Sequence, residues 1–358
     1  RLMKTFVKFP ESPYSNILYI FRNLRTGKYK CHLQTSVIWN TEKYGYVMED
    51  RINGKYEEGD VIPEGTVLAT SASFDSYNHY RAGVDARILY TPLHVLTEDA
   101  IWVSDELAER LGYSLVDTPT VDIKDGQFLL NNYGTLDNYK AFPDIGEPIK
   151  DGILCSLREK SSVSSKREAM IPHINDINYY TEGIVTDIEI MSNDPNLEDR
   201  QLRYYLTLQN KWYTDIYNYI SSIKNDMDES DSTLLDIYHK SEKHQMPSNV
   251  KWSTKEKLPY IQIHFTLLES KAVVNGQKIA GRFGNKSVIC NIVPTRLMPH
   301  TDDGRPTHML ANAFCPTNRI IAFALYEPAI TFRMERIHQE ETEKRMEERK
   351  EIKRRMEK

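Results

Sequence analysis

The sequence predicts a mixed α+β fold that contains more strand than helix and is interrupted by a helical insertion. Residues 17–21 form a short apolar, β-prone run, and apolar and polar residues alternate between residues 261 and 267. Alternation with a period of two is typical of a half-buried strand. Between residues 202 and 227, apolar side chains recur instead at steps of three and four, which is typical of an amphipathic helix.

The composition excludes several classes of protein. The 358 residues suffice for two or three domains. With 46 Lys and Arg against 51 Asp and Glu, the net charge is −5, so contact with nucleic acid requires a local basic patch or a partner chain. The four cysteines lie far apart, which argues against a zinc site or a disulfide framework and favours a reducing compartment. No apolar run approaches the length of a membrane span.

The expected elements divide the chain into five segments. Strands dominate the first, second and fourth segments, and a turn is expected at residues 25–28. Helices dominate the third, and the fifth is a charged helix that lacks glycine and proline. The segments are residues 1–112, 113–195, 196–257, 258–332 and 333–358.

Two helices are expected in the third segment. The first covers residues 202–227, and the acidic Glu198 and Asp199 suit its first turn. The second covers residues 234–244. The aromatic residues of the first helix are Trp212, Tyr213 and Tyr217. Packing in the core is the simpler explanation for them, and stacking on nucleic-acid bases is the alternative.

The most informative stretch is a glycine-rich loop at residues 274–287, Val-Asn-Gly-Gln-Lys-Ile-Ala-Gly-Arg-Phe-Gly-Asn-Lys-Ser. Three glycines stand here among Lys278, Arg282 and Lys286. Glycine lets a backbone approach a ligand closely, and both cations suit phosphate oxygens. An apolar run follows, so the loop should be anchored in a sheet. The residues alone fit a phosphate or nucleic-acid loop, or a turn with solvated lysines. They do not fit a P-loop, which needs Gly-Lys-Ser/Thr adjacent.

The same stretch resembles a signature of the β subunit of multisubunit DNA-directed RNA polymerases. Residues 276–287 align with the family's Gly-Asp-Lys-Met-Ala-Gly-Arg-His-Gly-Asn-Lys-Gly, with Phe283 replacing the His and Ser287 the last Gly. The match continues without a gap from Met298 to Glu327. In all, the resemblance covers about residues 30–330 and corresponds to a middle-to-late part of that subunit.

This resemblance implies a specific architecture. Residues 1–112 and 258–332 would form the two halves of a double-psi β-barrel, the first of them carrying the approach to the active site. A flap-like β region at 113–195 and the helical pair at 196–257 would be inserted between these halves. Residues 333–358 would add the charged C-terminal helix.

The resemblance also implies roles for the cations of the loop. Lys278 and Lys286 would contact phosphates at the RNA 3′ end and on the incoming nucleotide, and Arg319 would hold the nucleotide's triphosphate. These three residues are the catalytic candidates. Arg282 is a further candidate for nucleotide or RNA contact, although an internal salt bridge explains it equally well.

An acidic pair, Glu98 and Asp99, aligns with the family's Glu-Asp-Ala-Ile segment. The resemblance places this pair near the magnesium that accompanies the nucleotide, and oxygen ligands suit Mg²⁺. On the sequence alone, a solvated helix start is the more economical explanation. Residues 95–97 depart from the family's Gly-Tyr-Asn.

The implied function is that of a catalytic-core subunit, a nucleotidyltransferase component that is inactive alone. No segment resembles the Asn-Ala-Asp-Phe-Asp-Gly-Asp loop by which the β′ subunit holds the catalytic Mg²⁺, so a β′-like partner must supply that ion. The other implied partners are an N-terminal β-like chain or segment, template DNA, transcript RNA and NTPs, with a promoter-specificity factor as a further candidate.

Either the chain is a fragment, or its β subunit is divided between polypeptides, as in the multisubunit polymerases of large bacteriophages. We favour the second arrangement, which implies a location in the host cytoplasm or in the virion and none in a membrane. The alternative function is a non-catalytic β-barrel module that binds nucleic acid or builds a virion. Such a module has no reason to keep Lys278, Lys286 and Arg319 at the spacing found in polymerases.

Overall fold

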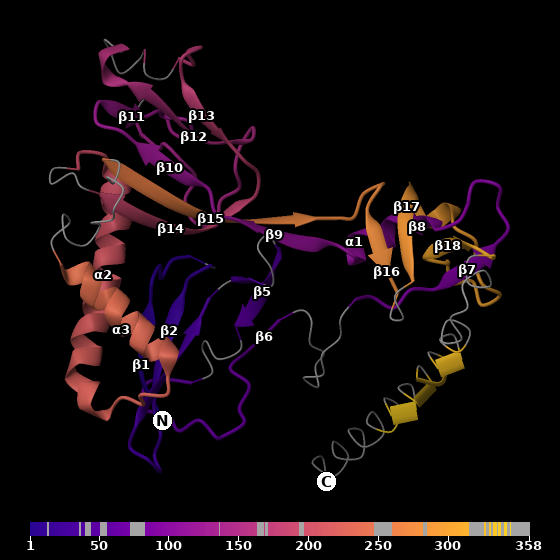
Figure 1. The fold of residues 1–358 in the computed structure, drawn as a ribbon, viewed down its shortest axis with the longest axis horizontal. Helices are drawn as coiled ribbons and strands as arrows, with labels where there is room; N and C mark the ends of the chain where they lie inside the picture. Colours follow the sequence, from indigo (N-terminus) through magenta and orange to yellow (C-terminus); the bar gives the residue numbers. More distant parts are fainter. Residues whose placement is uncertain are drawn as a thin grey trace, which may run out of the picture. The chain divides into compact units, whose positions relative to one another are not determined.

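The computed structural model (Figure 1) describes residues 1–12, 14–35, 37–39, 44–50, 56–71, 83–135, 137–162, 168, 171–192, 197–246, 260–281, 285–314, 326, 329, 330, 332–334, 336, 337, 340, 341 and 344. The chain divides into two compact units. Unit 1 comprises Arg1–Ala82 with Tyr113–Lys271, and unit 2 comprises Gly83–Gly112 with Ala272–Lys358. In the part of the chain just given, no helix is long and apolar enough to cross a lipid bilayer.

Unit 1 begins with a three-stranded antiparallel sheet in the order β1-β2-β3. The strands are β1 (Leu2–Val7), β2 (Ile17–Arg22) and β3 (Tyr29–Gln34). The central strand β2 confirms the strand expected at residues 17–21, and its first four residues are buried. The expected turn at 25–28 is also present, because the Asn23 Oδ1 atom accepts hydrogen bonds from the backbone N–H groups of Arg25 and Thr26.

The largest sheet of unit 1 is organised around the long strand β15 (Ile261–Lys271). Strand β14 (Ile184–Ser192) runs antiparallel along one edge of β15, and β9 and β10 pair with successive parts of it. The remaining strands are β9 (Tyr113–Asp117), β10 (Thr120–Ile123), β5 (Tyr44–Asp50), β4 (Val37–Trp39) and β6 (Ala69–Ser71). The predicted alternation is confirmed, because Ile261, Ile263, Phe265 and Leu267 are all buried.

A third sheet of unit 1 has the order β11-β12-β13. Its strands are β11 (Gln127–Leu129), β12 (Ile153–Glu159) and β13 (Ile177–Tyr180). Strand β12 carries a buried arginine, Arg158, whose guanidinium forms two hydrogen bonds with the Asp176 carboxylate, of 2.6 Å at Nε and 2.7 Å at Nη2. The chain just before β13 is therefore tied to the centre of this sheet by a buried ion pair.

The two predicted helices are confirmed as α2 (Arg200–Ile223) and α3 (Ser232–Gln245). The side chain of Asp199 caps α2 by accepting a hydrogen bond from the Leu202 N–H, so this residue lies just before the first turn in which it was expected. The N-terminal part of α2 packs on the β14–β15 sheet, and its later turns pack with α3 on the β1–β3 sheet (Figure 1). Trp212 and Tyr213 are buried in this second core, which confirms the packing explanation for them.

Gly183, just before β14, occupies a backbone position that a larger residue should not tolerate. Its φ angle is +120°, and an added Cβ atom would lie 2.8 Å from the Leu268 carbonyl oxygen on β15. We expect Gly183→Ala to lower the free energy of unfolding by roughly 1–3 kcal/mol, measured by urea titration. Gly152→Ala is the matched control, because Gly152 has a φ angle of +70° but open space around it. Equal losses in the two variants would contradict a role for the Leu268 contact.

Unit 2 contains a five-stranded sheet in the order β16-β17-β8-β18-β7 (Figure 1). The strands are β7 (Ile88–Thr91), β8 (Ala100–Ser104), β16 (Lys278–Ala280), β17 (Lys286–Val293) and β18 (Met309–Asn312), with the short helix α1 (Asp105–Arg110) following β8. β8 pairs in parallel with β17, and β7 in parallel with β18, while β8 and β18 are antiparallel. Two chain segments that lie far apart in the sequence thus form one sheet.

The fold is mixed α+β and rich in strands, as the sequence predicted. The sheets formed by the described strands are open paths, so the expected closed double-psi β-barrel is not confirmed. The sheet of unit 2 draws its N-terminal strands from residues 88–104, and residues 1–34 build a separate sheet against α2 and α3. Between residues 326 and 344 the described residues are helical, and Arg336 is ion-paired with Glu340 one turn later.

Candidate functional site

The glycine-rich stretch forms a β-hairpin in the structure. Strands β16 and β17 pair antiparallel, with Lys278 opposite Val288 and Ala280 opposite Lys286. Before the hairpin, the Gly276 N–H donates to the Ile289 carbonyl at 2.7 Å, and Gly276 has a φ angle of +90°, which glycine adopts without strain. The prediction that this stretch is anchored in a sheet is therefore confirmed.

The pairing register places Lys278 and Lys286 on the same face of the hairpin. Directly opposed residues of an antiparallel pair share a face, and so do residues two apart on one strand. Lys278 is opposite Val288, which lies two residues after Lys286, so the two lysines are diagonal neighbours with Cβ atoms roughly 7–8 Å apart. Both are exposed, and no ion pair involves either of them within the described residues. The hairpin thus carries two exposed lysines on one face.

The acidic pair lies at the same end of the sheet. Glu98 and Asp99 occupy a turn immediately before β8, and the Val288 N–H donates to the Asp99 carbonyl oxygen at 2.9 Å. Because β8 and β17 are parallel with Ala100 beside Val288, the start of β8 lies beside the start of β17, where Lys286 is found. The explanation of this pair as a helix start is wrong, because it precedes a strand and α1 begins only at Asp105.

The backbone of Glu98 is unusual. Its φ angle is +49°, in the left-handed region that residues other than glycine rarely adopt. Such strain persists where the surrounding structure enforces it, and here the preceding and following segments are fixed, since the Ala100 N–H bonds to the Thr97 carbonyl. The turn therefore fixes the backbone of Glu98, whose side chain is exposed, at this end of the sheet.

Two of the six candidate residues, Arg282 and Arg319, lie outside the described residues, so the structure does not place them. The other four come together at one end of the five-stranded sheet. Within the described residues, no three His, Cys, Asp or Glu side chains gather as a set of metal ligands. Glu98 and Asp99 thus offer two carboxylates, which suit a magnesium ion that is bound mainly by other groups.

An arginine and a histidine that the sequence analysis did not single out link the two parallel strands β7 and β18. The Arg87 carbonyl oxygen accepts hydrogen bonds from the backbone N–H groups of His308 and Met309. In return, the Arg87 N–H lies 3.1 Å from His308 Nδ1, and Arg87 Nη2 lies 2.8 Å from Nε2. A neutral imidazole has only one acceptor nitrogen, so only one of these two N–H groups can donate to His308 at a time, and a protonated imidazole could accept from neither. No local pattern marks this pair, because its members lie in distant segments.

This contact predicts a dependence of stability on pH. Burial, reinforced by Arg87 and Arg110, lowers the pKa of His308 below its ordinary value of 6.5. The unfolded chain therefore binds a proton more readily, so this contribution to stability is complete above pH 6.5 and is lost as the pH falls below that value. In urea titrations between pH 7.5 and 5.5, we expect a smaller pH dependence for His308→Gln than for the unchanged chain. Equal slopes would contradict the role of His308.

Comparison with known proteins identifies the family. The sequence profile described as RNA polymerase Rpb2, domain 6, matches residues 130–329, which is more than half of the chain and includes the β16–β17 hairpin. The chain belongs to this RNA polymerase family. It corresponds to a C-terminal part of a polymerase β subunit.

Similar β subunits share short segments with this chain. One from Saponaria officinalis, named DNA-directed RNA polymerase subunit beta, is 37% identical over 65 residues, 18% of this chain and 16% of the relative. The subunit beta C-terminal section of Pleurastrum terricola is 31% identical over 94 residues, 26% of this chain and 10% of the relative. The subunit beta of Oryza sativa is 32% identical over 82 residues, 23% of this chain and 8% of the relative. The chain thus matches less than a fifth of the length of these relatives.

Proposed function

We propose that this chain is the β-like catalytic-core subunit of a multisubunit DNA-dependent RNA polymerase. In this role Lys278 and Lys286 contact phosphates at the RNA 3′ end and on the incoming NTP. The observation that carries the proposal is the pair of exposed lysines on one face of the β16–β17 hairpin, within the segment that matches the polymerase family. The two neighbouring ammonium groups repel each other, and a phosphate bound between them would offset this repulsion because it attracts both.

Nucleotidyl transfer concentrates negative charge on the α-phosphate and on the departing pyrophosphate. Fixed cations stabilise this charge more strongly in a water-poor cleft than in bulk water. The hairpin suits the task because both of its strands are held in a sheet, which fixes the backbone positions from which the two lysines extend. Arg319 would hold the triphosphate, and Arg282 would add a further contact to nucleotide or RNA.

The catalytic Mg²⁺ would be bound mainly by a β′-like partner. When bound, such an ion neutralises phosphate charge and orients the attacking and leaving oxygens. Glu98 and Asp99, at the same end of the sheet as Lys286, would hydrogen-bond water around the ion that arrives with the NTP. The left-handed backbone of Glu98 supports this role, because strain of this kind gathers at functional sites.

The wider assembly belongs to the same proposal. The parallel pairs β8–β17 and β7–β18, each formed by two distant chain segments, suit the interlocked halves of a double-psi barrel. The protein partners would be the remaining β sequence and the β′-like subunit, with a promoter-specificity factor as a further candidate. The assembly would bind template DNA, transcript RNA and NTPs. A divided β subunit of bacteriophage type, acting in the host cytoplasm or carried in a virion, is part of the same proposal.

The test is to purify the chain through an affinity tag, together with the polypeptides that accompany it, and to supply a preassembled RNA–DNA scaffold with NTPs. We expect large partner chains to co-purify, the complex to extend the RNA, and the isolated chain to be inactive. A chain that purifies alone, or with virion proteins that extend no RNA, would instead support the non-catalytic module.

A further inference from the structure

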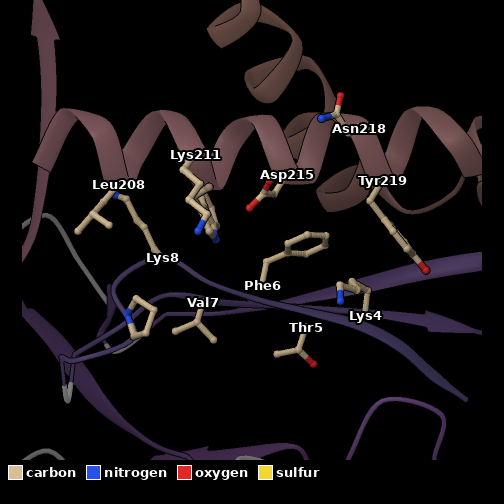
Figure 2. A pocket seen from close by; sticks show the side chains of 12 residues that line it. Lys4, Thr5, Phe6, Val7, Lys8, Leu208, Lys211, Asp215, Asn218 and Tyr219 are labelled. Atoms are coloured by element: carbon tan, nitrogen blue, oxygen red, sulfur yellow. The ribbon is translucent and has the colours of Figure 1, made fainter. Parts of the chain in front are cut away.

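Unit 1 contains a groove that the proposed catalytic role does not use. It lies between strand β1 and helix α2 and encloses about 680 Å³ (Figure 2). The residues of α2 that line it include Leu208, Lys211, Asp215 and Tyr219. They recur at steps of three and four, so they form one face of the helix. The opposite wall consists of β1 itself and the residues that follow it.

The groove runs along the outer edge of a sheet, where the backbone groups of Leu2 are already bonded to Gly59 and Asp60. β1 is an edge strand, because the sheet order is β1-β2-β3. Side chains alternate between the two faces of a strand, yet the consecutive residues 4–8 all line the groove. A cavity that touches both faces of a strand in this way must follow its edge. Figure 2 shows the strand residues along one side of the groove and the helix residues along the other.

The register shows which backbone groups face this edge. The Lys8 N–H donates to the Asn16 carbonyl of the neighbouring segment. In an antiparallel pair, the N–H and C=O groups of successive residues point alternately toward the partner strand and away from it. The backbone groups of Phe6 therefore point toward β2, and those of Thr5 and Val7 point outward. The Thr5 N–H confirms this direction, because it donates to the carboxylate of Glu58 at 3.0 Å. For the N–H and C=O groups of Val7, the described residues provide no partner. An edge strand with unpaired groups is a template for another strand.

The side chains along the groove show what kind of strand would fit. Phe6 and Leu208 provide an apolar wall, and the ring of Phe6 packs edge-on against Tyr219 at 5.8 Å between centroids. Lys211 is exposed, and no ion pair involves it among the residues that the structure describes. The other lysines of the groove are paired, Lys4 with Glu58 and Lys8 with Asp187. Asp215, four residues after Lys211, also lines the groove and is exposed, so the groove combines an apolar wall with one positive and one negative charge that form no ion pair among the described residues.

We propose that this groove binds an extended peptide of a partner protein, which adds to β1 as a fourth strand. The Val7 N–H and C=O groups would bond to the peptide backbone. A β-branched aliphatic side chain of the peptide would pack on Phe6 and Leu208, and an acidic side chain would pair with Lys211. Glu58 closes the strand edge at Thr5 and so limits the added strand to the stretch around Val7. Peptides that extend a sheet beside a helix gain affinity from the main chain and specificity from such alternate side chains.

The test uses the full chain and a fluorescein-labelled, end-blocked peptide of the sequence Thr-Val-Thr-Glu-Thr-Val, followed by fluorescence anisotropy. Its Val and Glu residues are two apart, so their side chains share one face of the strand. Two N-methylated versions of the peptide form a matched pair. In one, the Val and Glu residues are methylated, and in the other the Thr residues are, so that only one version blocks the N–H groups that face β1. We expect the unmodified peptide to bind, one methylated version to bind at least tenfold more weakly, and the other to bind nearly as well.

Protein variants locate the binding. Val7→Pro removes the outward N–H without removing a β1–β2 hydrogen bond and should weaken binding at least fivefold, whereas Val7→Ala should have little effect. Lys211→Glu should weaken binding of this peptide and strengthen binding of its Glu-to-Lys counterpart. Thermal melting confirms that each variant is folded. No binding up to millimolar peptide, equal effects of the two methylation patterns, or binding that is unaffected by Val7→Pro and Lys211→Glu would each overturn the proposal.

Discussion

Replacing both hairpin lysines, Lys278→Ala with Lys286→Ala, should slow nucleotide addition by the assembled polymerase about a thousandfold. Removal of a single preorganised donor from a transition-state site costs about 10²–10³ in rate, and the two ammonium groups lie on the same face of one hairpin. The loss should appear in the maximal rate of a single-nucleotide extension on a preassembled RNA–DNA scaffold, measured by rapid quench. Each single variant should fall between the double variant and the unchanged enzyme.

The matched control for the lysine variants is Lys124→Ala. Lys124 is an exposed lysine between β10 and β11, in the other compact unit, and its substitution removes one positive charge, as each single hairpin variant does. We expect it to leave the extension rate unchanged. If the double variant is also unaffected while assembly is intact, the lysines of the hairpin do not contact the reacting phosphates. If assembly itself fails, they belong to an interface between subunits.

The second large effect is expected for Arg158→Met in β12. Arg158 and Asp176 retain only 5% and 4% of their side-chain exposure, and the guanidinium also donates to the carbonyl oxygens of Glu168 and Ile171 at 3.1 and 2.7 Å. Removing the arginine leaves a buried carboxylate without its counter-charge. We expect the free energy of unfolding, measured by urea titration, to fall by about 3–5 kcal/mol, a large part of the stability of an ordinary domain.

The double variant Arg158→Met with Asp176→Leu separates the cost of an orphaned charge from the loss of packing. Two apolar side chains of similar volume leave no buried charge, so this variant should recover most of the lost stability. The pKa of Asp176 is held below its ordinary value, mainly by the hydrogen bonds from Arg158, so acidification should weaken the unchanged chain more than the double variant. A double variant as unstable as Arg158→Met would show that shape, and not charge, dominates this site.

The spacing of apolar residues in the sequence predicted those strands and helices in which one face is buried along the whole element. The period of two in β15 and the steps of three and four in α2 each correspond to one buried face, so both could be predicted without knowledge of the partner elements. The hairpin that carries Lys278 and Lys286 was also predictable as a loop anchored in a sheet, because its glycines and the apolar run after it are adjacent in the sequence.

Pairings between segments that are distant in the sequence produce no local pattern from which they could be predicted. The parallel pairing of β8 with β17 depends on Ala100 meeting Val288, and the contact of Arg87 with His308 is equally remote. The left-handed backbone of Glu98 is set by these pairings and not by the preference of glutamate, so it was not predictable. The assignment of residues 1–34 to a barrel followed the family resemblance, whereas in the structure they form a sheet packed against α2 and α3.

The composite sheet of unit 2 has a consequence for biosynthesis. Strand β8 leaves the ribosome long before its neighbour β17, since the intervening chain includes the whole of Tyr113–Lys271. At ordinary elongation rates of 5–20 residues per second, this delay is about 10–40 s. During that interval the side chains of Ile101 and Val103, which are buried in the finished sheet, have neither β17 nor the later strand β18 as a partner, so this sheet cannot be completed until both strands have emerged.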